Sequence, residues 1–214
     1  MIDIAVVDYG MGNLRSVYKA LRYVSPDRRI EISADPNLIA EAARVVVPGQ
    51  SAMPDTMRAL SASRLEPVIR EAAARKPFLG ICLGLQMLFE FSEEGDTACL
   101  AVFPGSVRRF SREPMADASG NRLKVPHMGW SRVHQTRAHP LWHDIADGSR
   151  FYFAHSYYPV PDDPQAPCAV VNYPTPFTCA AGRANIFAVQ FHPEKSHTTG
   201  LQLLANFVAW DGRA

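Results

Sequence analysis

The amino-acid sequence predicts an α/β fold, a doubly wound sheet with a parallel core to which antiparallel hairpins are added. Up to residue 82, apolar runs of strand length alternate with segments of helical periodicity, which is typical of a parallel sheet with helices on both faces. After residue 95, short strand-like pieces are separated by turn-rich and proline-rich segments, which indicates hairpins. We expect one domain over residues 1–214, because no linker or repeat divides the chain.

The first expected strand, residues 2–7, ends in a turn that contains Gly10 and Gly12, and a helix is expected at 14–24. Two glycines in this spacing suggest a dinucleotide-binding fingerprint. Arg15 occupies its third glycine position, however, where that fingerprint needs close contact between helix and strand. A tight turn at the carboxyl end of the strand is the better interpretation, and open α/β sheets bind ligands at such ends.

Strands and helices continue to alternate. We expect strands at 29–32 and 45–47 and helices at 36–43, 54–60 and 65–75. The first of these helices has Asp35 as its N-cap and Pro36 in its first turn. The strand at 45–47 runs into the loop Pro48-Gly49-Gln50-Ser51, where a glycine lets the backbone approach a ligand closely.

Residues 78–81 form a short buried strand that turns at Cys82 directly into an amphipathic helix. Gly80 and Gly84 flank the cysteine and relieve the crowding between strand and helix. This is the geometry of a nucleophile elbow with cysteine in place of serine, and the free N–H groups of the helix favour the thiolate over the thiol. Cys82 is therefore a candidate nucleophile; a buried structural cysteine in a tight turn is the alternative.

The second half of the chain supplies the hairpins. Strands are expected at 106–110, 122–125, 131–134, 151–158, 177–182 and 186–190. The turn-rich segment 111–120 and the proline-rich segment 159–167 interrupt them. A closing helix at 198–210 presents Leu204 and Phe207 on one apolar face.

A thiol nucleophile needs a base. Among the seven histidines, only His192 has an acidic residue two positions on, Glu194. Pro193 disfavours the helical region for His192, so we expect an extended segment, in which side chains at i and i+2 point to the same side. Glu194 can then accept a ring N–H of His192 and leave the other nitrogen for the thiol. A purely structural pair of histidine and glutamate is the alternative.

The composition excludes several classes of partner. A formal net charge of +1 without a dense Lys/Arg run gives no general affinity for polyanions, so we expect no nucleic acid. The four cysteines have no Cys-x-x-Cys spacing and no histidine close enough for a zinc site, and we expect neither a metal nor a cofactor. We expect a cytoplasmic protein that does not enter a membrane, because no apolar run could span a bilayer and no signal peptide is evident.

Together, the Gly-x-Cys-x-Gly elbow and the late His-Pro-Glu resemble the class I (triad-type) glutamine amidotransferase family over essentially the whole chain, which implies a flavodoxin-like sheet. Five further motifs support the resemblance. They are Val7-Asp8-Tyr9-Gly10-Met11-Gly12-Asn13-Leu14, Phe89-Glu90-Phe91-Ser92-Glu93-Glu94, Pro126-His127-Met128-Gly129-Trp130, His155-Ser156-Tyr157-Tyr158 and His192-Pro193-Glu194-Lys195-Ser196. They are similar to the glutaminase subunits that pass ammonia to a (β/α)8-barrel cyclase subunit, as a heterodimer, in histidine biosynthesis.

The resemblance implies hydrolysis of the side-chain amide of glutamine. The Cys82 thiolate attacks the carboxamide carbon, and His192 protonates the departing ammonia and then activates the water that releases glutamate. Glu194 holds His192 in place. Elbow geometry makes the N–H of Leu83 one donor to the oxyanion, and the resemblance places the other donor in the loop of Gly49 and Gln50.

By the same resemblance, Gln86 and Glu94 hold the amino-acid end of glutamine, together with the backbone around His155 and Ser156. Glu94 can accept hydrogen bonds from the ammonium group of glutamine. The alternatives are that Gln86 is an ordinary exposed helix residue and that Glu94 belongs to a solvated acidic turn. Ser51 stands where the family usually has a second glycine. If that position needs φ above zero, the serine costs about 1 kcal/mol or more.

A partner surface is expected at Pro126, His127, Met128 and Trp130, with Lys195 beside the triad. Apolar and aromatic residues of this kind are frequent at interface hot spots. Packing of Trp130 in the core is the alternative. Three other functions remain compatible with the motifs: an amidotransferase of another ammonia-using pathway, a cysteine-dependent hydrolase or peptidase, and a regulatory partner that keeps the fold.

Overall fold

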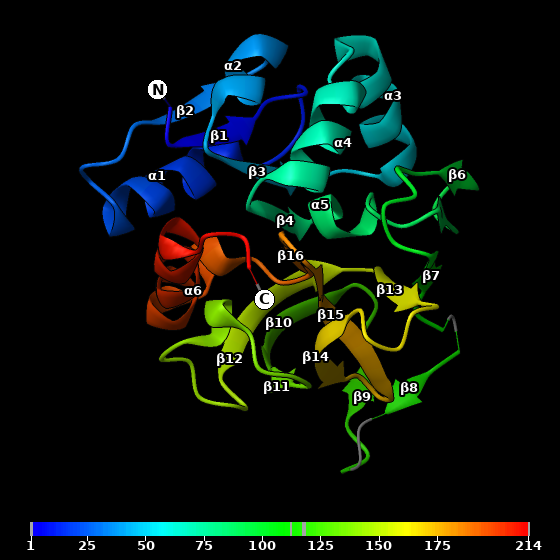
Figure 1. The fold of residues 1–214 in the computed structure, drawn as a ribbon. Coiled ribbons are helices and arrows are strands. Elements are labelled where there is room, and N and C mark those ends of the chain that lie inside the picture. Colours follow the sequence, from blue (N-terminus) through cyan, green and yellow to red (C-terminus); the bar gives the residue numbers. More distant parts are fainter. Residues whose placement is uncertain (1, 112, 117–118, 214) are drawn as a thin grey trace.

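The computed structural model describes residues 2–111, 113–116 and 119–213, and it confirms the expected α/β fold (Figure 1). Its main sheet has eight strands in the order β11-β14-β15-β16-β4-β3-β1-β2. They are β1 Ile4–Val7, β2 Ile30–Ser33, β3 Arg44–Gly49, β4 Phe78–Cys82, β11 His134–Gln135, β14 Pro167–Asn172, β15 Pro176–Arg183 and β16 Ile186–Val189. Strands β1 to β4 and β16 pair in parallel, whereas the pairs from β11 to β16 are antiparallel, as the added hairpins predict.

Helices cover both faces of this sheet (Figure 1). On one face lie α1 Leu14–Val24 and α6 His197–Ala209, and on the other lie α2 Pro36–Glu41, α3 Met53–Ser63 and α4 Glu66–Arg75. Each helix buries an apolar stripe, shown by Leu21 and Phe207 on the first face and by Ile39, Leu60 and Ile69 on the second, all of them inaccessible to solvent. The sheet is therefore doubly wound. In such sheets, ligands bind at the carboxyl ends of the parallel strands.

Smaller sheets continue from the main one. Their strands are β5 Phe91–Ser92, β6 Thr97–Ala98, β7 Gly105–Arg109, β8 Met115–Ala116, β9 Arg122–Leu123, β10 His127–Arg132, β12 Arg150–His155 and β13 Tyr157–Pro161. The single strand expected at 151–158 is two strands, because the chain leaves β10 at His155 and joins β7 from Tyr157 onward. Ser156 stands at this change of sheet and accepts the N–H of Phe110 with its carbonyl oxygen at 3.0 Å.

Two helices differ in length from the prediction. Asp35 caps α2 as expected, with Oδ1 accepting the N–H of Asn37 at 2.9 Å, but the helix ends at Glu41 because Ala42 is extended. After the elbow, α5 Leu83–Gln86 is a single turn rather than a longer amphipathic helix. The residues that follow it, 87–89, are fully buried, so no polar face remains to continue an exposed helix.

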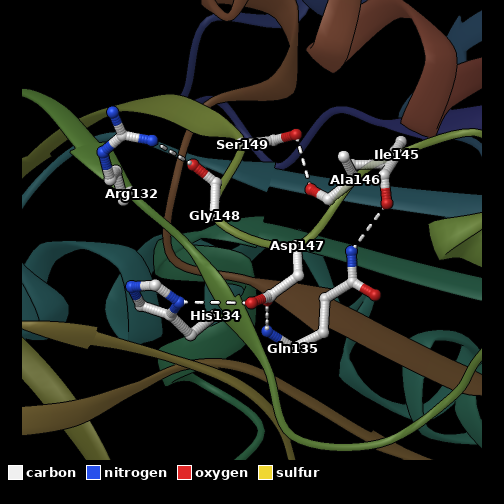
Figure 2. A network of polar contacts seen from close by, with 8 residues as sticks. All are labelled: Arg132, His134, Gln135, Ile145, Ala146, Asp147, Gly148 and Ser149. Atoms are coloured by element: carbon white, nitrogen blue, oxygen red, sulfur yellow. Dashed lines mark hydrogen bonds and ion pairs between the residues drawn. The ribbon is translucent and has the colours of Figure 1, made fainter.

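Polar contacts connect the loop that precedes β12 to strand β11 (Figure 2). The carboxylate of Asp147 accepts the N–H of Gln135 at 2.7 Å and lies 3.4 Å from Nδ1 of His134. The side chain of Gln135 donates to the carbonyl oxygen of Ile145 at 2.8 Å. The backbone hydrogen bond and the contact with His134 lower the pKa of Asp147. These contacts fix the entry into β12, which carries His155 toward the candidate site.

His139 is a buried neutral histidine just before the short 3-10 helix η1 Pro140–Trp142. Its ring packs against Phe187, with centroids 4.5 Å apart, and its Nδ1 accepts the N–H of Leu141 at 3.1 Å. Burial, reinforced by the charge of Arg137, lowers the pKa of His139 to about 4. The ring is therefore uncharged at neutral pH, although an unfolded histidine titrates near 6.5.

We expect His139→Asn to reduce the loss of stability in acid. The unfolded state binds the histidine proton first, so this contribution to stability is present above pH 6.5 and is lost as the pH falls to about 4. Asparagine keeps an acceptor for the N–H of Leu141 but does not titrate. Urea unfolding near neutrality and near pH 5 measures the difference, with exposed His143→Asn as the control. Equal acid sensitivity of wild type and His139→Asn would contradict this expectation.

Candidate active site

Three adjacent parallel strands bring the candidate site together. The register pairs Gly49 of β3 with Cys82 of β4, and Val189 of β16 with Ile81 of β4. The carboxyl ends of the three strands therefore lie side by side. The loop after β3, the elbow after β4 and the segment after β16 that carries His192 meet at this edge.

The backbone at Cys82 has the strain of a nucleophile elbow. Its φ is 56°, a positive value that costs a residue other than glycine about 1 to 3 kcal/mol. Gly84 approaches β3 so closely that a Cβ there would lie 1.9 Å from the carbonyl oxygen of Val47. A Cβ on Gly80 would lie 2.5 Å from the carbonyl oxygen of Gly84. Only glycines permit this packing, as the sequence predicts.

His192 lies between Cys82 and Glu194 in a buried setting. Nδ1 of His192 is 2.9 Å from Oε1 of Glu194, and both side chains are at most 3% exposed. Burial lowers the pKa of His192, but the nearby sulfur of Cys82 and the Glu194 carboxylate outweigh burial and raise that pKa to about 10. The imidazole is therefore a cation at neutral pH, held between a sulfur and a carboxylate.

The segment from His192 to Glu194 corrects one expectation. His192 itself is extended, with ψ of 96°, but Pro193–Lys195 forms the 3-10 turn η2 rather than an extended strand. Ser196 stabilises this turn, because its hydroxyl donates to the carbonyl oxygen of His192 at 2.6 Å and accepts the N–H of Tyr152 at 3.0 Å. The histidine and glutamate meet through a tight turn, and the predicted pair forms on a backbone other than the predicted one.

A cavity of about 320 Å³ opens beside Cys82. It is lined by Gln50, Ser51, Cys82, Leu83, Gln86, Glu94, Pro126, Met128, Ala154, His155, Ser156 and Tyr157. Five separate segments of the chain contribute to this lining, and each was singled out from the sequence. The volume is at the lower end of the range typical of small-molecule sites.

Gln86 is buried, so it is not the exposed helix residue of the alternative interpretation. Its Nε2 donates to the carbonyl oxygen of Tyr157 at 2.9 Å and to Oε1 of Gln190 at 2.8 Å. Its Oε1 is buried and has no hydrogen-bond partner among the described residues, although Gln86 lines the cavity. A buried oxygen of this kind is an acceptor available to a bound donor.

Glu94 also faces the cavity in a fixed position. Its Oε2 accepts the N–H of Met53, at the start of α3, at 2.8 Å, and its side chain lines the cavity. A helix N-terminus favours a carboxylate at this place. Glu94 is therefore anchored at the site instead of belonging to a freely solvated turn.

The loop after β3 packs directly on the elbow. A Cβ on Gly49 would lie 2.6 Å from Cβ of Leu83, so the two backbones are in close contact. Tyr9 is buried in the turn that follows β1. Its hydroxyl donates to the carbonyl oxygen of Pro48 at 2.7 Å and holds the end of β3 in position. Ser51 has no positive φ, so the strain considered for a serine at this position is absent in this conformation.

The residues expected at a partner surface separate into two groups. Pro126 and Met128 line the cavity on its exposed side, and Met128 is 65% exposed. Trp130 is half-buried and stacks on His197 with ring centroids 5.0 Å apart, and Lys195 is half-buried. The prediction for His127 is wrong, because this residue is only 2% exposed. Alternation along β10 turns His127 inward and Met128 outward.

The ring of His127 belongs to a buried chain that the sequence does not predict. Its Nδ1 is 3.0 Å from Nε2 of His155, and Nδ1 of His155 donates to the carbonyl oxygen of Tyr157 at 2.7 Å. Burial lowers the pKa of His127 to about 4 and that of His155 to about 3. Both rings are neutral at pH 7 and add no charge beside His192.

Gln190 and Tyr9 are further residues near Cys82 that sequence reasoning missed. Gln190 is fully buried, and its Nε2 lies 3.6 Å from the sulfur of Cys82. A usable signal was present, because Gln190 stands two residues before His192 and the i, i+2 rule applies backward as well as forward. The contact of Tyr9 with Pro48 joins residues far apart in the chain, and no local pattern indicates it.

Residues 2–111, 113–116 and 119–213 show neither a metal cluster nor a membrane-spanning helix. No group of three or more histidine, cysteine, aspartate or glutamate side chains in these ranges could hold a metal ion. No helix there is long and apolar enough to cross a membrane. Cys82, Cys99, Cys168 and Cys179 are free thiols.

Comparison with known proteins gives consistent results. The family model described as glutamine amidotransferase class-I matches residues 5–210. The chain is similar to imidazole glycerol phosphate synthase subunit HisH of Thiobacillus denitrificans, with 59% identity over 98% of this chain and 92% of the relative. The protein of the same description from Nitrosomonas europaea is 58% identical over 98% of this chain and 99% of its own length.

Solved structures support the fold. A crystal structure described as a glutamine amidotransferase has a TM-score of 0.71 with 13% identity, and the match covers 97% of this chain and 99% of that chain. A glutamine amidotransferase from Thermotoga maritima has a TM-score of 0.60 with 15% identity, covering 90% of this chain and 76% of that one. At these identities, the likeness concerns the fold alone.

We expect Cys82→Ser to lower the pKa of His192 from about 10 toward its ordinary value. Serine stays neutral, so burial is then opposed only by Glu194. The raised pKa of His192 adds stability that is fully present below pH 6.5 and is lost as the pH rises to about 10, so the variant should lose less stability over that window. NMR titration of the His192 ring and unfolding at both ends of the window measure these effects. An unchanged His192 titration would contradict the expectation.

Proposed function

The chain belongs to the class I glutamine amidotransferases, and on that premise we propose that it is the glutaminase subunit of an imidazole glycerol phosphate synthase. It hydrolyses glutamine to glutamate and ammonia, with Cys82, His192 and Glu194 as its catalytic triad. The observation that carries this proposal is the buried contact of His192 with Glu194 beside Cys82, a residue that lines the 320 Å³ cavity.

The geometry supports each step of amide hydrolysis. The sulfur of Cys82 attacks the carboxamide carbon of glutamine as a thiolate beside protonated His192 and forms a tetrahedral intermediate. His192 then gives its proton to the leaving nitrogen, and ammonia departs as the thioester forms. Neutral His192 takes a proton from a water molecule, which attacks the thioester and releases glutamate. Glu194 keeps Nδ1 of His192 protonated through the cycle.

Two loops supply the oxyanion donors in this proposal. The first is the N–H of Leu83, the residue after the nucleophile, as elbow geometry predicts; Leu83 also lines the cavity. The second donor comes from the loop of Gly49 and Gln50, which packs against Leu83. Removal of one such donor typically slows acyl transfer by about 100- to 1000-fold, so the position of this loop controls the rate.

The cavity also has groups for the amino-acid end of glutamine. The ammonium group of the substrate is a donor, and it can bind the partnerless Oε1 of Gln86 and the anchored carboxylate of Glu94. Ser156, at the gap between β12 and β13, supplies backbone near the substrate carboxylate, beside His155. These contacts place the side-chain amide of glutamine toward Cys82.

Ammonia released at this site would escape into water without a nearby consumer, so we propose a second subunit over the cavity mouth. The relatives are named as subunits of imidazole glycerol phosphate synthase, and the proposed partner is its (β/α)8-barrel cyclase, in a heterodimer. It uses ammonia to make imidazole glycerol phosphate and an aminoimidazole carboxamide ribotide. Pro126 and Met128 line the cavity and reach its exposed side, which makes them the central contacts of this interface.

Trp130 and Lys195 extend the proposed interface beyond the cavity mouth. Both are half-buried, and Trp130 is held flat against His197. The reaction takes place in the cytoplasm in this proposal, because the nucleophile must remain a free thiol and a reducing compartment keeps it so.

Replacement of the nucleophile tests the proposed reaction. We expect Cys82→Ala to reduce glutamine-dependent synthesis by at least about 10⁴-fold, because no thiolate remains to form the thioester. Synthesis from added ammonium should be unchanged, since the cyclase needs only ammonia. Glutamate release and product formation, measured with the reconstituted pair, distinguish the two activities. Glutaminase turnover retained by Cys82→Ala would refute the assignment of the nucleophile.

The partner should also affect the rate of hydrolysis. We expect the isolated chain to be a slow glutaminase, stimulated about 100-fold or more when the cyclase and its ligand align the loop that donates to the oxyanion. Glutamate release with and without the cyclase subunit measures the stimulation, and bovine serum albumin replaces the cyclase in the control. Full activity of the chain alone would contradict control by the partner.

A further inference from the structure

We propose that Gln190 is a catalytic residue that donates a hydrogen bond to the sulfur of Cys82 throughout the reaction. The inference deepens the proposed function and rests on it, since it concerns the same nucleophile. Gln190 is neither a member of the triad nor part of the cavity lining, and no local motif assigned it a role.

Gln190 has a fixed and completely buried position. It directly follows β16, and its backbone N–H donates to the carbonyl oxygen of Cys179 at 2.8 Å. Its Nε2 lies 3.6 Å from the sulfur of Cys82, which is within hydrogen-bonding distance for sulfur. Because β16 and β4 pair in parallel, this contact follows from the register of the two strands.

The orientation of the Gln190 amide is determined by a chain of contacts that begins at a carbonyl group. The carbonyl oxygen of Tyr157 can only accept, so the atom of Gln86 that contacts it must be Nε2. The same Nε2 contacts Gln190, which must then present its Oε1. Nε2 of Gln190 is left to point at Cys82, and a flipped amide would place donor against donor.

The Tyr157 carbonyl oxygen has a second donor that strengthens this arrangement. Nδ1 of His155 donates to it at 2.7 Å, and His155 in turn contacts His127. Both rings are neutral at pH 7, so this support does not change charge during turnover. A carbonyl oxygen with two buried donors is a firm anchor for the amide chain.

An amide donor does what His192 cannot do alone. His192 gives its proton to ammonia and must recover it from water, so its hydrogen bond to sulfur is lost for part of each cycle. Gln190 does not titrate and donates at every stage. It therefore stabilises the thiolate both before attack and when the sulfur leaves the second tetrahedral intermediate. A hydrogen bond to a charged group changes an equilibrium or rate by about 10- to 100-fold.

The reactivity of Cys82 toward iodoacetamide tests this role independently of glutamine. The full chain is alkylated over a range of pH, and the peptide that contains Cys82 is quantified by mass spectrometry, with Cys82→Ser as the blank. We expect Gln190→Met to slow alkylation near neutral pH by about 10- to 100-fold and to move its midpoint to higher pH. Gln165→Leu, at an exposed glutamine, is the matched control.

A second variant keeps the test valid if methionine disturbs folding. Gln190→Glu preserves the shape and the acceptor for Gln86 but replaces the donor by a carboxylate, so the alkylation rate should fall further than in Gln190→Met. Thermal unfolding selects the variants that are folded. In folded Gln190→Glu, which keeps the acceptor for Gln86, kcat for glutamine hydrolysis should fall by about 10- to 100-fold with KM changed less than about two-fold.

The outcomes separate the inference from the proposed function. Alkylation and kcat at wild-type levels in folded Gln190 variants would overturn the role of Gln190, while glutamine hydrolysis by the wild type would still stand. Slower alkylation in the variants, together with no glutamine hydrolysis by the wild type with its cyclase, would support the hydrogen bond to sulfur and overturn the proposed function.

Discussion

The parallel register of β3, β4 and β16 is the constraint on which the site depends. These strands end at one edge, so residues separated by more than 100 positions in the chain meet around Cys82. The close contacts at Gly80 and Gly84 follow from this register, because the turn after β4 must pass directly over β3. A shift of one residue in this register would turn Cys82 away from His192.

Few of the buried groups in the site are charged at neutral pH. His192 carries a positive charge that the Cys82 sulfur and the Glu194 carboxylate balance. The neighbouring rings of His127 and His155 are kept neutral by burial, and their hydrogen bonds end at a carbonyl oxygen. The hydrogen bond from Gln190 to the Cys82 sulfur comes from an amide, which does not titrate. Of these three imidazole rings, only that of His192 is charged at neutral pH.

Much of the fold and of the site could be predicted because their signals are local. Alternating apolar runs indicate the parallel core, and the spacing of Gly80, Cys82 and Gly84 indicates the elbow. The pairing of His192 with Glu194 was predicted from an extended segment, although a 3-10 turn produces it. Local spacing limits which side chains can meet. The backbone conformation between them depends on the hydrogen bonds of the turn that follows.

The features that could not be predicted depend on contacts between distant segments. The burial of His127 arises from stacking on Phe153 of β12 and on Tyr173, which follows β14. The one-turn length of α5 follows from complete burial of the residues after it. Hydrophobic periodicity along one segment does not indicate which distant residues pack against that segment.

The position of β16 has a consequence for the order of synthesis. This strand is the last of the main sheet to be made, yet it lies in the interior of the sheet, between β4 and β15. A nascent chain that has reached only the elbow therefore exposes the edge of β4, with an unpaired thiol at its end. His192 and Glu194, the base and its partner in the proposed triad, emerge from the ribosome a few residues after β16. The proposed triad is thus complete only after the strand that closes the sheet has been made.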